Sequence, residues 1–572
     1  MSEGSIPDCH GEDAFPISSF TQFDTASPFA VPYDVHNGGV NEQFRSERES
    51  PPGPTSDILW RCKTRQNLTG ASLPQIRRDL ARAWRLMLAS HINEAVGVID
   101  RIELQLDDVA PAIANRLRAA TQLVRAAGLA FQDDSLAALA IAVSYLKQGW
   151  PNEDFHAAST LCRLGFWQLG NFDVFYSLPR HKPRVRWSRS LAISTMLDLS
   201  IEAAVALDHL HLSTAKRLAS DALNIVKTAP KEIGGLAALP ACLTAQVLYE
   251  QGYLDEADAI LRDRLPAINA EGSFECAFRA YLVLTQITKH RMQYDLAALL
   301  LREGEALGER RGWPRLVVAC LAERALLLLR GGRTEEAGLV FEYLNRYADT
   351  HRAGSGYSGA EIIRYRTLTR WRVSWAEAPS REAVAALRQL YHHAIEKRDL
   401  YVGCRLAVEL AEMLVVIGET EEAAALFFCT VKAGAAAGLY QIFLEGGAEL
   451  GMLLNGAYTR AEAPGSMDRE ILPFVGSLLS RWEARRADRR STQASGRVND
   501  PLTPRERDIL AMISQGFSNK HIARTLDISP ETVKSHVKRI FAKLAVNTRT
   551  EAVSRAGSLG LCDVRSYFKG PS

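Results

Sequence analysis

The sequence predicts an all-α protein: an α-solenoid of about nine helix-pair repeats followed by a small domain of four helices. Three observations predict it. Between about residues 58 and 480, apolar residues recur at helical spacing without an alternating strand pattern. A turn-and-helix motif returns about every 40 residues in the same region. After residue 500, four short segments each begin with a residue that caps helices.

The N-terminal segment, residues 1–57, differs in composition from the rest of the chain. It contains seven Pro, five Gly and many Ser, and it shows no sustained period. Such a segment is expected to be disordered.

The repeated motif predicts residues 58–480 to be a solenoid of the tetratricopeptide type, acting as a sensor or interaction domain. Its clearest copies are EQGYLDEADAIL, LRGGRTEEAGLVF and VIGETEEAAALF. The equivalent small position falls at Ala95, Ala137, Val174, Ala215, Ala257, Ala297, Ala337, Ala383 and Ala423, of which Ala137 fits least well. A small residue lets two helices approach closely, and Gly in the turn permits a sharp reversal. One helix pair cannot bury its own apolar face, so the pairs are expected to stack. An irregular helical domain with accidental periodicity is the alternative.

A basic segment comes after the solenoid. Residues 481–500 are expected to form a basic linker: their Arg-rich start could extend the last helix of the body, and the part rich in Ser, Gln and Gly predicts flexibility. Residues 481–572 carry a net charge of +9, whereas the rest of the chain carries −7. This asymmetry indicates that only the C-terminal part meets a polyanion.

Residues 501–566 are expected to fold into four capped helices. Thr503, Pro504 and Glu506 form a capping box, Ser518 opens the second helix and Ser529 the third. A fourth helix is expected from Thr548 onward.

The two faces of the third helix differ in chemistry. Val533, Val537, Ile540 and Leu544 fall on one apolar stripe, while Ser535, Lys538, Arg539 and Ala542 lie opposite and Lys534 lies on the flank. A solvated face usually mixes both signs of charge. This face instead presents donors suited to phosphates and guanine edges in a major groove.

The stretch LTPRERDILAMISQGFSNKHIARTLDISPETVKSHVKRIFAKLAVNTRTEAVSRAGSLGL closely resembles the LuxR-type helix-turn-helix domain. The resemblance implies that the third helix enters the major groove. It places Lys534, Ser535 and Lys538 against bases, and Asn519, Lys520, Thr532 and Arg539 against phosphates. It also implies pairing of two protomers through Ala552, Val553 and Ala556. Many relatives have Val or an amide at the position of Ser535. A sigma-factor-like protein would need additional segments that the solenoid does not resemble.

The body is similar to another group. GLYQIFLEGGAELGMLL, residues 438–454, is similar to the segment that closes the superhelical domain of MalT-like regulators. Those regulators usually carry an ATP-binding domain, but this chain contains no Gly-Lys dipeptide and hence no phosphate loop. No ATP-driven step is therefore expected.

Other sites are not predicted. The nine cysteines are scattered, His209 and His211 lack a third ligand, and no catalytic arrangement has motif support. Carboxylates are expected at solvated helix positions. Packing between repeats is expected for Trp84, Trp167, Trp313, Trp371 and Tyr440, and a place in a ligand groove is the alternative for each of them. No apolar run is long enough to span a membrane and no secretory signal is recognised, which predicts a cytoplasmic protein.

Together these features predict a non-enzymatic, cofactor-free transcriptional regulator that acts as an activator rather than a repressor. It would bind promoter double-stranded DNA as a homodimer and contact RNA polymerase. The solenoid would sense a small molecule or a protein partner. The alternative is a helical-repeat scaffold that uses the DNA-binding domain as an anchor.

Overall fold

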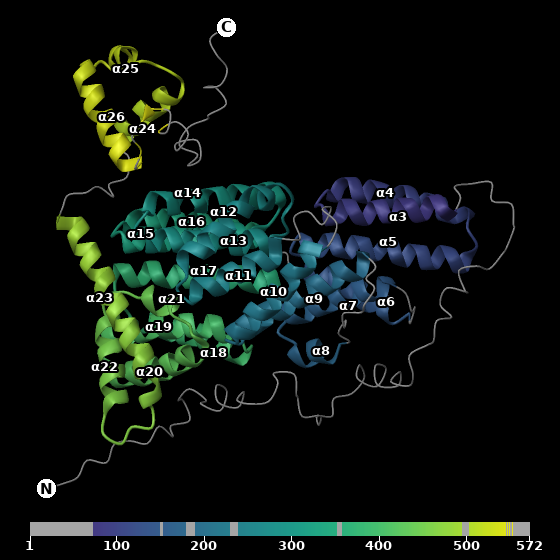
Figure 1. The fold of residues 1–572 in the computed structure, drawn as a ribbon, viewed down its shortest axis with the longest axis horizontal. Helices are drawn as coiled ribbons and strands as arrows, with labels where there is room; N and C mark the ends of the chain where they lie inside the picture. Colours follow the sequence, from purple (N-terminus) through teal and green to yellow (C-terminus); the bar gives the residue numbers. More distant parts are fainter. Residues whose placement is uncertain are drawn as a thin grey trace.

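The structure is a computed structural model that describes residues 73–148, 153–178, 189–228, 238–351, 357–494 and 503–544, with Val546, Thr548, Arg549 and Ala552. Within these residues all regular secondary structure is helical (Figure 1), which confirms the all-α prediction. The predicted disordered segment 1–57 and residues 58–72, the expected start of the solenoid, lie outside them.

Nine helix pairs succeed one another in the described part of the chain, as predicted. They are α3 (Leu73–Leu88) and α4 (Ile92–Gln105), α5 (Pro111–Phe131) and α6 (Ser135–Leu146), α7 (Glu153–Gln168) and α8 (Phe172–Ser177), α9 (Arg189–Asp208) and α10 (Leu212–Thr228), α11 (Ala238–Glu250) and α12 (Leu254–Glu271), α13 (Phe274–His290) and α14 (Tyr294–Arg311), α15 (Pro314–Arg330) and α16 (Thr334–Thr350), α17 (Tyr357–Glu377) and α18 (Arg381–Glu396), and α19 (Leu400–Val416) and α20 (Thr420–Ala437). Three further helices end the body: α21 (Gln441–Leu444), α22 (Leu450–Glu462) and α23 (Leu472–Ala494). No helix among the described residues is both long and apolar enough to cross a membrane.

The small position of the repeat lies at the contact between the two helices of a pair. Seven of the predicted residues are at most 1% exposed: Ala95, Ala215, Ala257, Ala297, Ala337, Ala383 and Ala423. Two predicted positions are wrong by one residue, because Ala138 and Phe175 are buried in place of Ala137 and Val174. Burial at these positions explains why the period of about 40 residues is visible in the sequence.

Most of the turns share one backbone feature. The residue five positions before the buried one adopts a left-handed conformation, with φ of 88° at Gly252 and Gly418 and 71° at Gly332. Glycine was expected there, yet Leu210 (φ 63°) and Met292 (φ 60°) adopt the same conformation. The turn is therefore imposed by helix packing, at a steric cost where the residue is not glycine.

Arg398, an exposed residue with φ 56° in the turn before α19, allows this cost to be measured. Arg398→Gly is expected to stabilise the protein by about 0.5–1 kcal/mol, because relief of the left-handed strain exceeds the entropy cost of glycine. Lys397→Gly is the matched control, since the exposed Lys397 has φ −78°. Urea unfolding of both variants measures the difference. Stabilisation by Lys397→Gly, or destabilisation by Arg398→Gly, would contradict this explanation.

The superhelix returns onto itself. Helix α9 packs against α19, and α11 packs against α21. The backbone N–H of Tyr440 donates to the carbonyl oxygen of Glu250 at 2.8 Å. One continuous core joins Leu207 and Val247 to Phe427 and Leu478. The body is thus a closed array, with the first helix of several pairs facing its interior.

The Arg-rich start of the expected linker extends the last helix of the body, because α23 continues to Ala494 and also includes residues 491–494 of the part expected to be flexible. Packing on the end of the body holds the Arg-rich segment in a helix. The Arg481 guanidinium lies 4.5 Å from the centre of the Tyr440 ring, and Arg485 donates to the carbonyl oxygen of Leu444 at 2.5 Å. The indole of Trp482 lies against Gly451, where a Cβ atom would collide with it. Residues 495–502, which complete the expected linker, lie outside the described residues.

Candidate nucleic-acid interface and a charged cavity

The first helix of the C-terminal domain, α24 (Pro504–Ser514), begins at the predicted capping box. The Glu506 N–H donates to Thr503 Oγ1 at 3.2 Å, and the Thr503 N–H donates to Glu506 Oε2 at 2.9 Å. The inward residues Ile509, Leu510 and Ile513 are fully buried. Gly516, with φ 87°, ends the helix in a left-handed turn. This helix provides the support on which the next two pack.

Two serines begin the following helices, as expected. Ser518 Oγ accepts from the His521 N–H at 3.3 Å at the start of α25 (Asn519–Thr525). Ser529 Oγ accepts from the Thr532 N–H at 3.0 Å at the start of α26 (Pro530–Leu544). The turn between them contains Asp527 with φ 51°, which brings α26 sharply across α25. The three helices form a small bundle in Figure 1.

The outer face of α26 presents the residues expected to read bases. Val533 and Ile540 are fully buried, whereas Lys534, Ser535 and Lys538 are exposed. Lys534 Nζ donates to Glu531 Oε1 at 2.6 Å, and the two side chains are 61% and 78% exposed. An exposed pair of this kind contributes little stability, so a phosphate or a base can replace Glu531 at small cost.

The residues expected to contact phosphates lie around the same face. Lys520, Thr532 and Arg539 are exposed. Asn519 Oδ1 accepts from Arg549 Nη1 at 3.3 Å, and Arg549 also donates to the carbonyl oxygen of Phe517. Arg549 is not among the residues predicted from the sequence to support this face, although it forms part of the NTRTEAV motif. Arg549 thereby ties the start of the expected fourth helix to α25.

The residues expected to pair two protomers are only partly described. Ala552 is fully buried in the core of its own domain, together with Ile509 and Ile540. Its side chain therefore supports the fold of one protomer. Val553 and Ala556 lie outside the described residues.

Comparison with known proteins agrees with this arrangement. Residues 500–556 match the family described as bacterial regulatory proteins, luxR family. This part of the chain is a LuxR-type helix-turn-helix domain. The nitrate/nitrite response regulator protein NarL of Escherichia coli (strain K12) is 52% identical over 100 residues, which cover 18% of this chain and 42% of NarL. The HTH-type transcriptional regulator MalT of Vibrio cholerae serotype O1 is 44% identical over 59 residues, or 10% of this chain and 6% of MalT. The chain thus matches less than half the length of each of these relatives.

The helical body has a more distant structural neighbour. This neighbour is a crystal structure of a Rap protein complexed with competence and sporulation factor. The alignment covers 64% of this chain and 99% of the Rap chain. The sequence identity is 15% and the TM-score is 0.47.

A cavity of about 500 Å³ lies inside the closed array of helix pairs that precedes this LuxR-type domain in the chain. Its walls come from α7, α9, α11, α13, α15, α17 and α19, with the segment 442–449 completing them. Trp167 and Trp371 are among the lining residues. Two roles were considered for these tryptophans, packing between repeats and lining a ligand groove. Their position in the cavity wall fits the second role.

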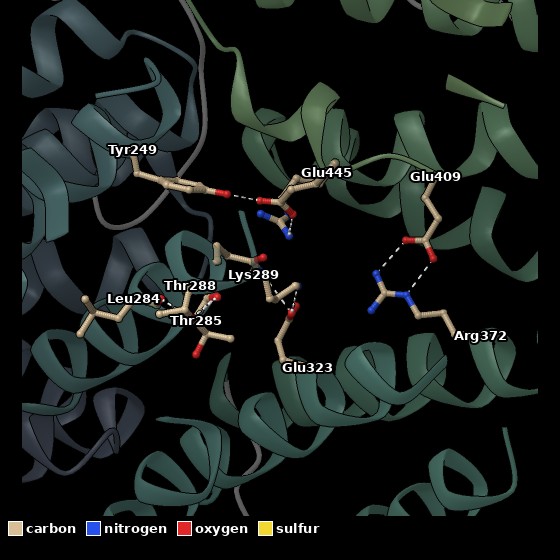
Figure 2. Close-up of polar contacts among 11 residues, drawn as sticks. Tyr249, Leu284, Thr285, Thr288, Lys289, Glu323, Arg372, Glu409 and Glu445 are labelled. Carbon is tan, nitrogen blue, oxygen red and sulfur yellow. Dashed lines mark hydrogen bonds and ion pairs between the residues drawn. The ribbon is translucent and has the colours of Figure 1, made fainter. Parts of the chain in front are cut away.

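Several ion pairs lie in or against the walls of the cavity. Arg372 donates to both carboxylate oxygens of Glu409 at 2.7 Å, and Lys289 Nζ lies 3.1 Å from Glu323 Oε2. Figure 2 shows these pairs, and the contact of Tyr249 with Glu445, approaching one central space from different helices. The expectation that carboxylates occupy solvated helix positions is wrong here, because closure of the array turns this face of the first helices inward.

These pairings shift the pKa values of the carboxyl groups in the cavity wall. Burial alone would raise the pKa of Glu323, but the Lys289 ammonium lowers it to about 2. Burial is likewise opposed at Glu409, where the Arg372 guanidinium holds the pKa below its usual value. Glu250 differs, since burial and the nearby charge of Glu445 raise its pKa to about 7. Its Oε1 accepts from the Tyr401 hydroxyl at 2.5 Å, at the place where α11 meets α19.

Because the pKa of Glu250 is raised, the closed body is expected to lose stability as the pH rises. Its pKa in the folded state lies above the unfolded value, so its stabilising contribution is present below the unfolded pKa and is lost as the pH passes about 7. Glu250→Gln is expected to be more stable than the parent by roughly 2–3 kcal/mol at pH 8, with little difference at pH 5. Urea unfolding at both pH values measures this, with the exposed Glu256→Gln as control. An equal effect at both pH values would exclude titration of Glu250 as the cause.

Metal binding has no support in the described part of the chain, where no group of three or more His, Cys, Asp or Glu is arranged to hold an ion. His209 and His211 lie in the turn between α9 and α10, with ring centres 6.4 Å apart, and not along a helix. Burial lowers the pKa of His209 to about 4, so this side chain is neutral at physiological pH.

Proposed function

We propose that this protein is a sequence-specific, DNA-binding transcriptional regulator whose helical body senses an effector. One observation carries the proposal. Lys534, Ser535 and Lys538 are exposed together on α26, the helix that comes after the turn of a LuxR-type domain. Such a helix presents its donors to base edges in the major groove. Asn519, Lys520, Thr532 and Arg539 flank it and would position the domain through phosphates.

The effector would bind in the charged cavity and alter the body. An effector changes activity only through its different affinities for two arrangements of the protein. Action as an activator, contact with RNA polymerase and binding as a homodimer belong to the same proposal. Val553 and Ala556 would supply the contact between protomers.

Selection from a random library of double-stranded DNA by the full-length chain tests this function. A regulator is expected to enrich one sequence, with two related half-sites if it binds as a homodimer. Enrichment without a common sequence would favour a helical-repeat scaffold that uses the domain as an anchor. A single half-site would argue against the homodimer alone.

Salt dependence provides a quantitative prediction. The logarithm of the affinity for a selected site is expected to fall linearly with the logarithm of the salt concentration. Lys520→Ala should make the slope less steep by about one for each protomer, because one phosphate contact is lost. Gln515→Ala, an exposed and uncharged position in the same domain, should leave the slope unchanged. Fluorescence anisotropy at several salt concentrations measures it, and an unchanged slope for Lys520→Ala would remove Lys520 from the interface.

A further inference from the structure

The charges that line the cavity do not cancel. Its lining contains six guanidinium groups and nine carboxyl groups. The guanidinium groups are mostly matched: Arg364 lies 2.6 Å from Glu361, Arg405 3.1 Å from Glu445, and Arg315 3.0 Å from Glu275. An anionic ligand would have to displace these carboxylates or use Arg330, which forms no ion pair among the described residues. The carboxyl groups of the lining still outnumber its guanidinium groups.

Two further carboxyl groups, those of Asp208 and Asp399, line the cavity where α9 packs against α19. Asp208, at the end of α9, accepts a hydrogen bond from Trp167 Nε1 at 2.7 Å. Asp399 accepts one from the Val402 N–H at 3.1 Å, at the start of α19. Neither forms an ion pair within the described residues. Burial raises the pKa of Asp208 well above its usual value and the neighbouring charge of Asp399 raises it further, while the Arg279 guanidinium opposes both effects. Two such groups are costly to ionise together unless a cation joins them.

A separate observation also indicates a ligand that donates hydrogen bonds. Gln286 lines the cavity and is 6% exposed. Its amide nitrogen donates to Glu323 at 3.1 Å, but its carbonyl oxygen Oε1 has no hydrogen-bond partner among the described residues. A buried acceptor without a partner is costly, so a donor from a bound molecule would stabilise this side chain.

The remaining walls accommodate an apolar or aromatic body. Phe278, Tyr365, Trp371 and Trp375 line the same cavity. Aromatic rings bind both hydrocarbon chains and cations. The volume of about 500 Å³ is within the range of small-ligand sites.

We propose that the cavity binds an organic cation whose ammonium or guanidinium group lies between Asp208 and Asp399, with its apolar part against the aromatic walls. The inference deepens the proposed function, because it gives the chemical class of the effector that the body would sense. A free amine and a basic side chain of a short peptide share this chemistry.

Titration calorimetry of the full-length chain tests the inference and separates the two sources. The probes are agmatine and a blocked peptide Leu-Arg-Leu, each with a neutral counterpart: 4-ureidobutanol for agmatine, and the same peptide with citrulline in place of Arg. At least one cationic probe is expected to bind ten or more times more tightly than its neutral counterpart. Preference for agmatine would identify a free amine, and preference for the Arg peptide a peptide effector. Equal binding of the charged and neutral probes, or no binding of either cation, would overturn the inference.

Variants assign the binding to these two carboxyl groups. Asp208→Asn with Asp399→Asn is expected to abolish the preference for the cation while the unliganded protein stays as stable as the parent or becomes more stable. Asp263→Asn, an exposed position on α12, should change neither property. A preference that persists in the double variant would overturn the assignment. DNA binding is measured on the same preparations: failure of cation binding with intact DNA binding would remove this inference alone, whereas loss of DNA binding alone would remove the proposed function.

Discussion

Replacing Lys534 and Lys538 together by Ala is expected to lower the affinity for a selected DNA site about thirtyfold or more for each bound protomer. Each lost specific contact costs about 1–3 kcal/mol, and two contacts are removed from each protomer. Both side chains are exposed, so the domain should remain folded. Affinity for unrelated DNA should fall much less, because Lys520 and Arg539, proposed to contact phosphates, would be unchanged. Anisotropy titrations with specific and unrelated duplexes measure both quantities.

The control for this variant removes the same charge elsewhere. Lys147→Ala with Lys227→Ala changes two exposed lysines of the body. This control should bind the selected site with the parent affinity. If the Lys534/Lys538 variant also kept the parent affinity and selectivity, α26 would not be the helix that reads DNA.

The second large effect is expected at Arg315. Its guanidinium is 2% exposed and lies 2.7 Å from Asp133 and 3.0 Å from Glu275, above the ring of Phe274 at 4.1 Å. Arg315→Ala would leave the buried Asp133 without its cation, whereas Glu275 would keep Arg279 at 3.4 Å; breaking such a buried pair costs about 3–5 kcal/mol of folding free energy. Burial already raises the pKa of Asp133 to about 6, so part of this loss would appear as proton uptake by Asp133.

Urea unfolding compares Arg315→Ala with Arg333→Ala. Arg333 also pairs with a carboxylate, Glu336, but both side chains are 53% exposed. Its loss should cost at most about 1 kcal/mol. Arg315→Lys is expected to lie between the two, because it retains the charge without the planar fork. A cost below about 1 kcal/mol for Arg315→Ala would mean that this buried pair does not stabilise the body.

The two parts of the fold were predictable for different reasons. The small residues of the repeat, such as Ala257 and Ala337, are fully buried because two helices meet there, so the periodicity reports packing within a pair. In the C-terminal domain, capping residues such as Thr503 act on neighbours three positions away, and the sequence displays such local contacts directly.

Contacts between distant repeats left no comparable signal. Arg315 and Asp133 belong to repeats far apart in the chain, and neither residue differs in the sequence from an ordinary surface charge. The inward face of α19, with Arg405 and Glu409, is polar and therefore resembles a solvated face. Local information left residues 481–494 open between a helix and a linker, and contacts such as Trp482 with Gly451 extend the last helix there. The cavity depends on closure of the array, and closure is a property of many helix angles together.

Closure also affects how the body can be divided. In an open array of repeats, each repeat contacts only its neighbours, so removing terminal repeats shortens the protein and leaves the rest intact. Here α9 and α11 are covered by α19 and α21, which lie many repeats further along the chain. A truncation after α18 would uncover apolar surface near the middle of the chain as well as at the new end. The repeats are therefore expected to unfold in a single transition, and shortened fragments of this body to aggregate where those of open arrays remain soluble.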